Sequence, residues 1–194
     1  MELMHFFKEY LASPSKVGSW VPSSYELADL ITDTAGVRTV DSIVEFGAGS
    51  GVFTEVIARK LKPGATFFAI EISEEFVKAS RKRCPGVRIL HDSAANVGKH
   101  MAEMGLKHVD CIISGLPFAL FEDNLQDHLL DAAYDALRPG GMFVTFTYFM
   151  SPYMPRGRRF RRRLQRRFGV VDETPIVWRN FLPAFAYRAV KKPV

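Results

Sequence analysis

The chain of 194 residues has only two cysteines, Cys84 and Cys111, and no long apolar run. Two cysteines without a CxxC pair exclude a disulfide framework and a zinc site of that kind, and they fit a reducing compartment. No stretch approaches the roughly 18 consecutive apolar residues of a membrane-spanning helix. The first residues lack the basic-then-apolar order of a secretory signal. These absences favour a cytoplasmic protein that touches a membrane, if at all, only at its surface, and no metal site is predicted.

Positive charge is concentrated in one segment. The chain has 26 Lys and Arg against 21 Asp and Glu, which gives a net charge of +5. Eight of the arginines lie in Arg156–Arg167, and without these eight the net charge would be −3. A mildly acidic domain with one cationic segment is expected to bind phosphate, on lipid headgroups or on nucleic acid.

Apolar runs alternate with segments of helical spacing, and this pattern predicts one α/β domain over residues 1–194 with a parallel sheet covered on both faces. After a basic helical stretch, two β-like runs predict an antiparallel hairpin at the sheet edge. The expected strands are Ser42–Phe46, Ala65–Ile70, Val87–Leu90, Val109–Ile113, Met142–Tyr148, Val170–Trp178 and Phe185–Val190. The expected helices are Gly51–Leu61, one capped by Ser73, Ala94–Met104 and Leu120–Leu137.

The first twenty residues form a separate segment. The apolar residues of Leu3–Leu11 follow the spacing of an amphipathic helix, which Ser13 and Pro14 end. Two interpretations remain open. The helix either covers the domain core, or it lies at a lipid interface and acts as a lid.

A glycine-rich loop follows the first expected strand. Residues 44–51 read Val-Glu-Phe-Gly-Ala-Gly-Ser-Gly, and glycines there permit a tight turn and the close approach of a ligand. A dinucleotide fingerprint would need a glycine at Val52. The GxGxG form with an acid before it resembles motif I of class I S-adenosylmethionine-dependent methyltransferases. The resemblance implies that Glu45 faces the amino group of the cofactor and that its methionine part lies along Gly47, Ala48, Gly49 and Gly51.

Two acids end the next two expected strands. Glu71, 20 residues after Gly51, stands where an acid accepts both ribose hydroxyls in Rossmann domains. Asp92 begins a segment that resembles the adenine-binding motif of the same methyltransferases. A loop and two acids at the ends of successive strands point to S-adenosylmethionine, with another nucleotide-binding α/β protein as the alternative. The implied cofactor site also includes Ile72, Ser93, Ala94, Ser114 and Leu116.

The loop after the fourth expected strand, residues 114–118, reads Ser-Gly-Leu-Pro-Phe. It resembles the Asn-Leu/Ile-Pro-Tyr/Phe motif of rRNA adenine dimethylases, which binds an aromatic amino group. Ser114 in place of that Asn suits an sp³ amine better than a nucleobase edge. Phe118 offers an aromatic face to a cation. The alternative is a loop that only packs into the core.

Residues 44–51 and 114–118, together with Pro-Ser-Ser-Tyr-Glu-Leu-Ala at 22–28, resemble the bacterial phospholipid N-methyltransferases. The resemblance implies a Rossmann-like class I methyltransferase: a seven-stranded, mostly parallel sheet with a C-terminal antiparallel hairpin and helices on both faces. It implies S-adenosylmethionine-dependent N-methylation of phosphatidylethanolamine, and of its mono- and dimethyl derivatives, to phosphatidylcholine. It also implies that the N-terminal amphipathic helix holds the protein on the inner face of the cell membrane.

The acceptor in this interpretation is a neutral amine, so its proton must be accepted before or during attack. Tyr148, at the end of the fifth strand, and Tyr25, from the N-terminal lid, are expected to position the amine, with Ser114 beside them. His91 and His100 are interpreted as surface or packing residues. The expected acceptor site also includes Trp20, Pro117, Phe118 and Tyr153.

The arginine segment is expected to recognise the lipid. One or two of Arg156, Arg158 and Arg159 are predicted to hold the phosphate, because a guanidinium group binds phosphate with a planar fork of donors. The other arginines of Arg156–Arg167 are expected to face an anionic membrane, with a solvated helix face as the alternative for several of them.

Two other functions remain open. An RNA methyltransferase fits the glycine loop and the arginines equally well. Against it stand Ser114 and the roughly 45 residues after the fifth strand, too few for an RNA-binding domain, so no nucleic-acid partner is expected. A non-catalytic cofactor-binding protein that docks on membranes or nucleic acid is the other alternative.

Overall fold

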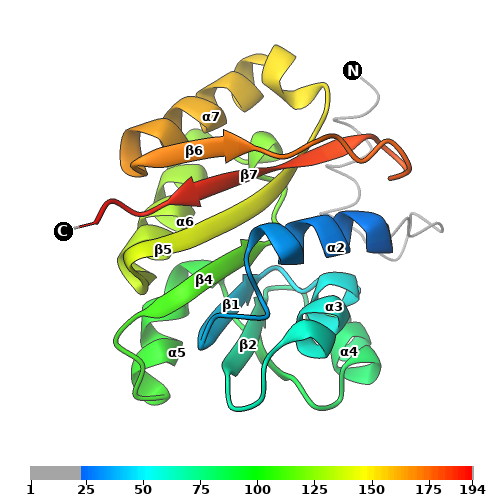
Figure 1. Cartoon of the computed structure of the whole chain (residues 1–194), viewed down its shortest axis with the longest axis vertical. Coiled ribbons are helices and arrows are strands. Elements are labelled where there is room, and N and C mark those ends of the chain that lie inside the picture. Colours follow the sequence, from blue (N-terminus) through cyan, green and yellow to red (C-terminus); the bar gives the residue numbers. More distant parts are fainter. Residues whose placement is uncertain (1–22, 194) are drawn as a thin grey trace.

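The computed structural model describes residues 23–193, which form a seven-stranded sheet with helices on both faces (Figure 1). The strands lie in the order β3-β2-β1-β4-β5-β7-β6. The strands are β1 (Ser42–Phe46), β2 (Thr66–Glu71), β3 (Arg88–His91), β4 (Val109–Ser114), β5 (Leu137–Tyr148), β6 (Val170–Glu173) and β7 (Ala184–Val190). The α-helices are α2 (Tyr25–Thr34), α3 (Val52–Lys60), α4 (Glu74–Arg83), α5 (Val97–Glu103), α6 (Asp123–Ala136) and α7 (Pro155–Arg167). Short 3₁₀ turns are η1 (Ala94–Asn96), η2 (Phe118–Leu120) and η3 (Ser151–Tyr153).

Strands β1 to β5 are parallel, and β7 pairs antiparallel with both β5 and β6. This arrangement confirms the expected fold: a mostly parallel sheet, a C-terminal antiparallel hairpin, and the Rossmann-like order of a class I methyltransferase. The expected N-terminal helix and Trp20 lie outside the described residues.

The sheet separates two hydrophobic cores (Figure 1). On one face, α5, α6 and α7 bury side chains such as Leu130 and Phe160 against the strands. On the other face, α2 and α3 bury residues such as Ile31 and Ile57. Because the helices cover both faces, the carboxyl ends of the parallel strands are left as the edge where a ligand can bind.

Two predicted boundaries differ from the structure. The run Val170–Trp178 forms a strand only as far as Glu173. The Ala186 N–H of β7 donates to the Thr174 hydroxyl and not to a backbone carbonyl. The next residue, Pro175, has no N–H with which to continue the strand pairing. The segment 174–183 instead forms a turn that leads into β7. Strand β5 begins earlier than expected, at Leu137, with a register irregularity opposite β4.

Helix α2 was not among the expected helices. Its signals are nevertheless present in the sequence: Ser24 accepts a hydrogen bond from the Leu27 N–H at 3.1 Å, and Leu27 and Ile31 are four residues apart and fully buried. Within residues 23–193, no helix is long and apolar enough to cross a bilayer.

Gly157 fixes how α7 meets the turn η3. A Cβ atom at Gly157 would lie 2.0 Å from the Ser151 carbonyl oxygen, which real contacts do not allow. We therefore expect Gly157→Ala to destabilise the protein by about 1–3 kcal/mol, measured by denaturant unfolding. Gly98, exposed and with no neighbour within 4 Å, is the matched control, and Gly98→Ala should be neutral or stabilising. Equal stability of the two variants would contradict this account.

Candidate functional site

The glycine loop leaves β1 in a conformation that only glycine adopts easily. Gly47, Gly49 and Gly51 have φ of 78°, 51° and 83°. A Cβ atom at Gly49 would meet nothing within 4 Å, so open space lies beside the loop backbone. A Cβ atom at Gly51 would press on Ser80 of α4 at 3.2 Å. The loop thus presents its backbone to a ligand on one side and packs on α4 on the other.

The loops after β1 and β4 are in direct contact. A Cβ atom at Gly115 would lie 2.7 Å from the Gly47 carbonyl oxygen, and one at Gly47 would lie 2.7 Å from Leu116 Cδ2. The Gly115 N–H also donates to the Phe46 carbonyl at 2.8 Å. This contact explains why the β4 loop carries glycine at position 115, and it places residues 114–118 beside the glycine loop.

Glu71 joins the glycine loop to the end of β2. Its carboxylate accepts the Gly49 N–H through Oε2 and the Ser73 N–H through Oε1, both at 2.9 Å. A carboxylate has about four acceptor positions, so Glu71 can still accept two ribose hydroxyls. The exposed side chain of Ile72 follows directly and offers an apolar surface to an adenine ring.

Glu45 is a completely buried carboxylate beneath the glycine loop. Its Oε2 accepts the Thr54 hydroxyl at 2.7 Å, whereas Oε1 has no partner among residues 23–193. Burial raises the pKa of Glu45 to about 8, because water no longer solvates the charged form. Once Glu45 loses its proton, Oε1 is a buried acceptor that fits a ligand bringing an ammonium group, as the methionine part of S-adenosylmethionine does.

Asp92, at the end of β3, is held by three donors. Its carboxylate accepts from the Ser93 N–H at 2.7 Å, from Asn96 Nδ2 at 2.8 Å and from His100 Nε2 at 2.8 Å. The Asn96 hydrogen bond, with those from Ser93 and His100, lowers the pKa of Asp92 to about 2. His100 thus orients Asp92 from α5, consistent with its interpretation as a packing residue. His91 Nε2 lies 3.1 Å from the Ile72 carbonyl.

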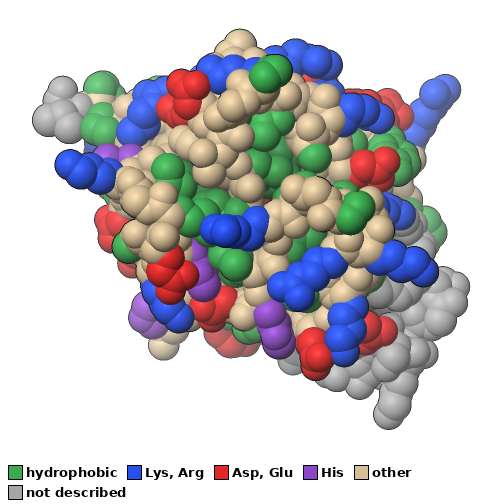
Figure 2. All heavy atoms as spheres, turned by 90° about the horizontal axis from the view of Figure 1, so that it is seen from below, with side chains coloured by type: hydrophobic (Ala, Val, Ile, Leu, Met, Phe, Trp, Pro, Cys, Tyr) green, Lys and Arg blue, Asp and Glu red, His purple; other side chains and the backbone are tan. Residues whose placement is uncertain are grey.

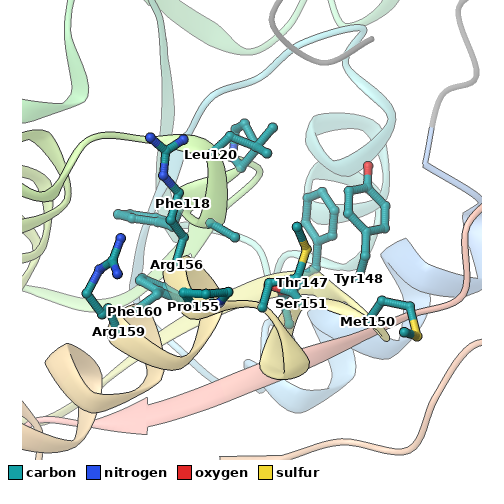
Figure 3. Close-up of a pocket in the computed structure, with 15 residues that line it drawn as sticks. Phe118, Leu120, Thr147, Tyr148, Met150, Ser151, Pro155, Arg156, Arg159 and Phe160 are labelled. Atoms are coloured by element: carbon teal, nitrogen blue, oxygen red, sulfur yellow. The ribbon is translucent and has the colours of Figure 1, made fainter. Parts of the chain in front are cut away.

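An apolar cavity of about 420 Å³ opens beyond the β4 loop, between η2, the end of β5, η3 and the start of α7 (Figure 3). The guanidinium groups of Arg156 and Arg159 lie on one side of it, and Tyr148 and Met150 lie on the opposite side (Figure 3). Within residues 23–193, no acidic residue lines it. The lining residues are Pro117, Phe118, Ala119, Leu120, Phe146, Thr147, Tyr148, Met150, Ser151, Met154, Pro155, Arg156, Gly157, Arg159 and Phe160.

The family profile described as "Methyltransferase domain" matches residues 43–141, about half of the chain. The chain belongs to the class I S-adenosylmethionine-dependent methyltransferases. Its cofactor is S-adenosylmethionine, and the open space at Gly49, the acceptors of Glu71 and the unpaired oxygen of Glu45 fit that molecule.

Relatives of this methyltransferase act on different acceptors. The chain is 27% identical to the ornithine lipid N-methyltransferase of Singulisphaera acidiphila over 194 aligned positions, which cover 96% of each chain. The O-methyltransferase of Bacillus cereus, solved in complex with SAH, has a TM-score of 0.73 and 15% identity, covering 99% of this chain and 91% of that one. The N-methyltransferase NodS of Bradyrhizobium japonicum has a TM-score of 0.62 and 14% identity, covering 86% and 93%. The solved structures show the shared fold.

Part of the predicted acceptor set lines the cavity of the methyltransferase. Pro117, Phe118, Tyr148, Arg156 and Arg159 meet there. Sequence reasoning missed Phe160, which stacks on Phe118 with ring centroids 4.7 Å apart. It also missed Gln126, a buried residue of α6 whose Nε2 donates to the Phe118 and Phe121 carbonyls. An isolated glutamine in an otherwise apolar helix face is the signal that could have revealed it.

Four other predicted acceptor residues do not line the cavity. Ser114 is completely buried, and its Oγ accepts the Leu116 N–H at 3.2 Å, so it shapes the β4 loop. The Tyr25 hydroxyl donates to Glu55 Oε2 at 2.9 Å, and this hydrogen bond raises the pKa of Tyr25. Tyr153 and Arg158 are exposed outside the cavity. A direct role of these four in catalysis or acceptor binding remains a prediction.

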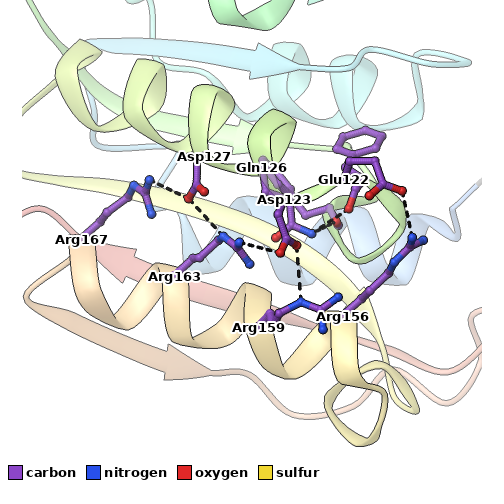
Figure 4. A network of polar contacts seen from close by, with 10 residues as sticks. Glu122, Asp123, Gln126, Asp127, Arg156, Arg159, Arg163 and Arg167 are labelled. Atoms are coloured by element: carbon purple, nitrogen blue, oxygen red, sulfur yellow. Dashed lines mark hydrogen bonds and ion pairs between the residues drawn. The ribbon is translucent and has the colours of Figure 1, made fainter.

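The arginines of α7 form a ladder of ion pairs with the acids of α6 (Figure 4). We define this α6–α7 ladder as the pairs Arg156–Glu122, Arg159–Asp123, Arg163–Asp123, Arg163–Asp127, Arg167–Asp127 and Arg167–Asp131. Arg163 and Arg167 are therefore not part of a membrane-facing surface, and contact of the other arginines with a membrane stays a prediction. Arg163 and Arg167 point to α6, because α6 carries acids at a matching helical spacing. Arg161 pairs with Glu173 of β6.

Three arginines of α7 have no ion pair within residues 23–193. Arg158, Arg162 and Arg166 are all exposed and follow one another at intervals of four residues, so they form one stripe along the helix. The opposite end of the molecule, where α4 and α5 lie, has basic, acidic and histidine side chains intermixed (Figure 2). The stripe is thus a local concentration of unpaired positive charge.

Glu45 makes the stability of the cofactor-free protein depend on pH. The folded state keeps a proton on Glu45 up to about pH 8, while the unfolded state releases it near the ordinary carboxyl pKa of 4.5. The free energy of unfolding should therefore fall as pH rises from about 5 to 8, by on the order of 4 kcal/mol. Glu45→Gln, which stays neutral, should remove that part of the slope. Parallel unfolding profiles of the two proteins over this pH range would contradict the assignment.

Proposed function

We propose that this methyltransferase N-methylates phosphatidylethanolamine, and its mono- and dimethyl derivatives, at the surface of an anionic membrane. The observation that carries the proposal is the apolar cavity with Arg156 and Arg159 on one side, whose lining begins at Pro117, directly after the Gly115 and Leu116 that contact the cofactor loop. A lipid headgroup that joins an amine, an anion and an apolar chain matches both parts of this cavity. The relative from Singulisphaera acidiphila, named for N-methylation of a lipid, supports the proposal.

The cavity favours the reactive form of an amine. A free alkylamine has a pKa of about 10, so it is mostly protonated at neutral pH. An apolar surrounding disfavours the charged form of the amine, and no carboxylate is among the residues of 23–193 that line the cavity. The ammonium group would release its proton to solvent before it enters the cavity, and the neutral amine could then form a bond to the methyl carbon while the bond from that carbon to the donor sulfur breaks. When bound, S-adenosylmethionine supplies that methyl group, and the chain orients the amine and excludes water.

The anion of the headgroup would be bound by the first arginines of α7. Arg156 donates to Glu122 at 2.9 Å through Nη2, and the Glu122 side chain is 79% exposed. An exposed ion pair of this kind contributes little, about 0–1 kcal/mol. A guanidinium group has five donors, so a phosphate can bind Arg156 beside Glu122 or displace it.

The membrane partner would meet the stripe Arg158, Arg162 and Arg166. These arginines have no ion pair within the described part of the chain, and each basic residue near an anionic surface contributes about 1 kcal/mol of attraction. The stripe shares α7 with Arg156 and Arg159, so attraction to the membrane brings the cavity to the lipid.

A direct test offers four acceptors to the purified protein with labelled S-adenosylmethionine. The acceptors are phosphatidylethanolamine in anionic vesicles, ornithine lipid in the same vesicles, RNA, and vesicles without any amine. We expect transfer to phosphatidylethanolamine. Transfer to ornithine lipid alone would retain lipid N-methylation but contradict the phospholipid substrate. Transfer to RNA alone, or to no acceptor, would contradict the proposal.

Arg156→Gln should raise the KM for a water-soluble short-chain phosphatidylethanolamine by about tenfold or more with a small change in kcat, because a charge-assisted hydrogen bond to the anion is lost. Arg162→Gln removes an exposed arginine that does not line the cavity, and it should leave KM unchanged. Glu122→Gln frees Arg156 and should leave KM equal or lower. An unchanged KM in Arg156→Gln would refute this role.

A further inference from the structure

Large apolar side chains are concentrated around the mouth of the cavity. Nine are exposed within residues 23–193, and five of the nine lie in only two segments, 150–154 and 178–181. Phe149 joins the two segments: its ring centroid lies 5.5 Å from that of Trp178 and 6.0 Å from that of Tyr153. We define the aromatic rim as Phe149, Met150, Tyr153, Met154, Trp178 and Phe181.

The turn that carries Trp178 and Phe181 is held in a defined conformation. Val177 and Ala184 close it with two backbone hydrogen bonds of 2.7 and 3.3 Å. Asn180, between the two aromatic residues, is buried, with Nδ2 donating to the Leu182 carbonyl and Oδ1 accepting the Ser24 N–H. Trp178 and Phe181 are nevertheless 64% and 67% exposed. The structured turn therefore holds two large apolar side chains out toward the surroundings.

The aromatic rim is continuous with the acceptor cavity. Met150 and Met154 belong to the rim and also line the cavity. In Figure 3, Met150 lies on the side away from Arg156 and Arg159. A molecule in contact with the rim therefore has a continuous apolar path into the cavity.

Unpaired positive charge accompanies the rim. Arg158 follows Met154 by four residues, and Arg179 follows Trp178 directly. Both arginines are exposed, and neither has an ion pair within residues 23–193. Amphipathic aromatic rings beside unpaired arginines match the interface of an anionic bilayer, where Trp and Tyr lie at the level of the headgroups.

We propose that the aromatic rim inserts into the boundary between headgroups and acyl chains of an anionic bilayer, so that the cavity opens directly onto the lipid. The part of this proposal in which the cavity opens onto the lipid rests on the proposed function, because that function assumes a lipid acceptor. Trp178 and Phe181 provide most of the insertion, and Arg158 and Arg179 bind the headgroups around them.

The test measures membrane binding without catalysis. The chain has two tryptophans, so Trp20→Phe leaves Trp178 as the reporter. Vesicles of phosphatidylglycerol and phosphatidylcholine contain no amine to methylate. We expect the Trp178 emission to shift to shorter wavelength on binding and to be quenched by brominated acyl chains. Absence of both the shift and the quenching would overturn the proposal.

A double variant separates the rim from the active site. Trp178→Ser with Phe181→Ser should lower vesicle affinity in co-sedimentation by about tenfold or more. Its rate on monomeric short-chain phosphatidylethanolamine should remain within about twofold, because neither residue lines the cavity. The matched control is Val170→Ser, an exposed apolar residue at the start of β6 that should bind vesicles as the unmodified chain does.

The outcomes distinguish the two proposals. Loss of vesicle binding in the double variant supports insertion of the aromatic rim, whether or not a lipid is methylated. Absence of lipid methylation by the unmodified chain would overturn only the proposed function. Unchanged vesicle binding in the double variant overturns the rim, whatever the activity. A third outcome is that the unmodified chain self-associates without binding vesicles and that the double variant no longer self-associates. This outcome would also overturn insertion of the rim and would assign this surface to a second copy of the chain.

Discussion

The contact between the loops after β1 and β4 determines where the other parts of the site can lie. Because neither Gly47 nor Gly115 carries a side chain, the two loops approach until a Cβ atom on either would overlap its neighbour. This approach places the cofactor loop directly against residues 114–118, whose far end opens into the acceptor cavity. Holding two reactants in a fixed relative position is a large part of what a protein can contribute to methyl transfer.

Helix α7 forms the other wall of the cavity, and its charges have two different roles. Arg163 and Arg167 pair with acids of α6 and fix the helix over the sheet, while Phe160 and Leu164 fill the core beneath it. The first arginines of the same helix reach the cavity, and the stripe Arg158, Arg162 and Arg166 faces outward. Within one arginine-rich helix, some arginines therefore form ion pairs with α6 and others lie beside the acceptor cavity. A third group is exposed, with no ion pair in the described part of the chain. Composition alone cannot separate these roles, because it does not reveal which acids face each arginine.

The sequence predicted the fold and the identity of the cofactor, but only part of the set of residues around the acceptor cavity, for a physical reason. Glycines and acids at strand ends, such as Gly49 and Glu71, are local signals, and their partners follow from strand order. The acceptor cavity depends on contacts between distant segments, so Phe160 and Gln126 could not be recognised as its neighbours. The motif at residues 114–118 predicted the place of Ser114 at the end of β4. It could not predict that Ser114 is buried, because burial depends on the packing of two loops. The exposed turn at Trp178 was expected to be a strand, and only the structure shows it beside Phe149.

The central claim is that the atom methylated is the amine nitrogen of a lipid headgroup bound beside Arg156. The most direct measurement incubates the protein and S-adenosylmethionine carrying a ¹³C-methyl group with anionic vesicles that contain phosphatidylethanolamine, and identifies the labelled atom by NMR and mass spectrometry of the extracted lipid. The account predicts label on the headgroup nitrogen, giving mono-, di- and trimethylated lipid in turn. Label on an oxygen, or no label in the lipid fraction while the protein methylates another acceptor, would contradict it.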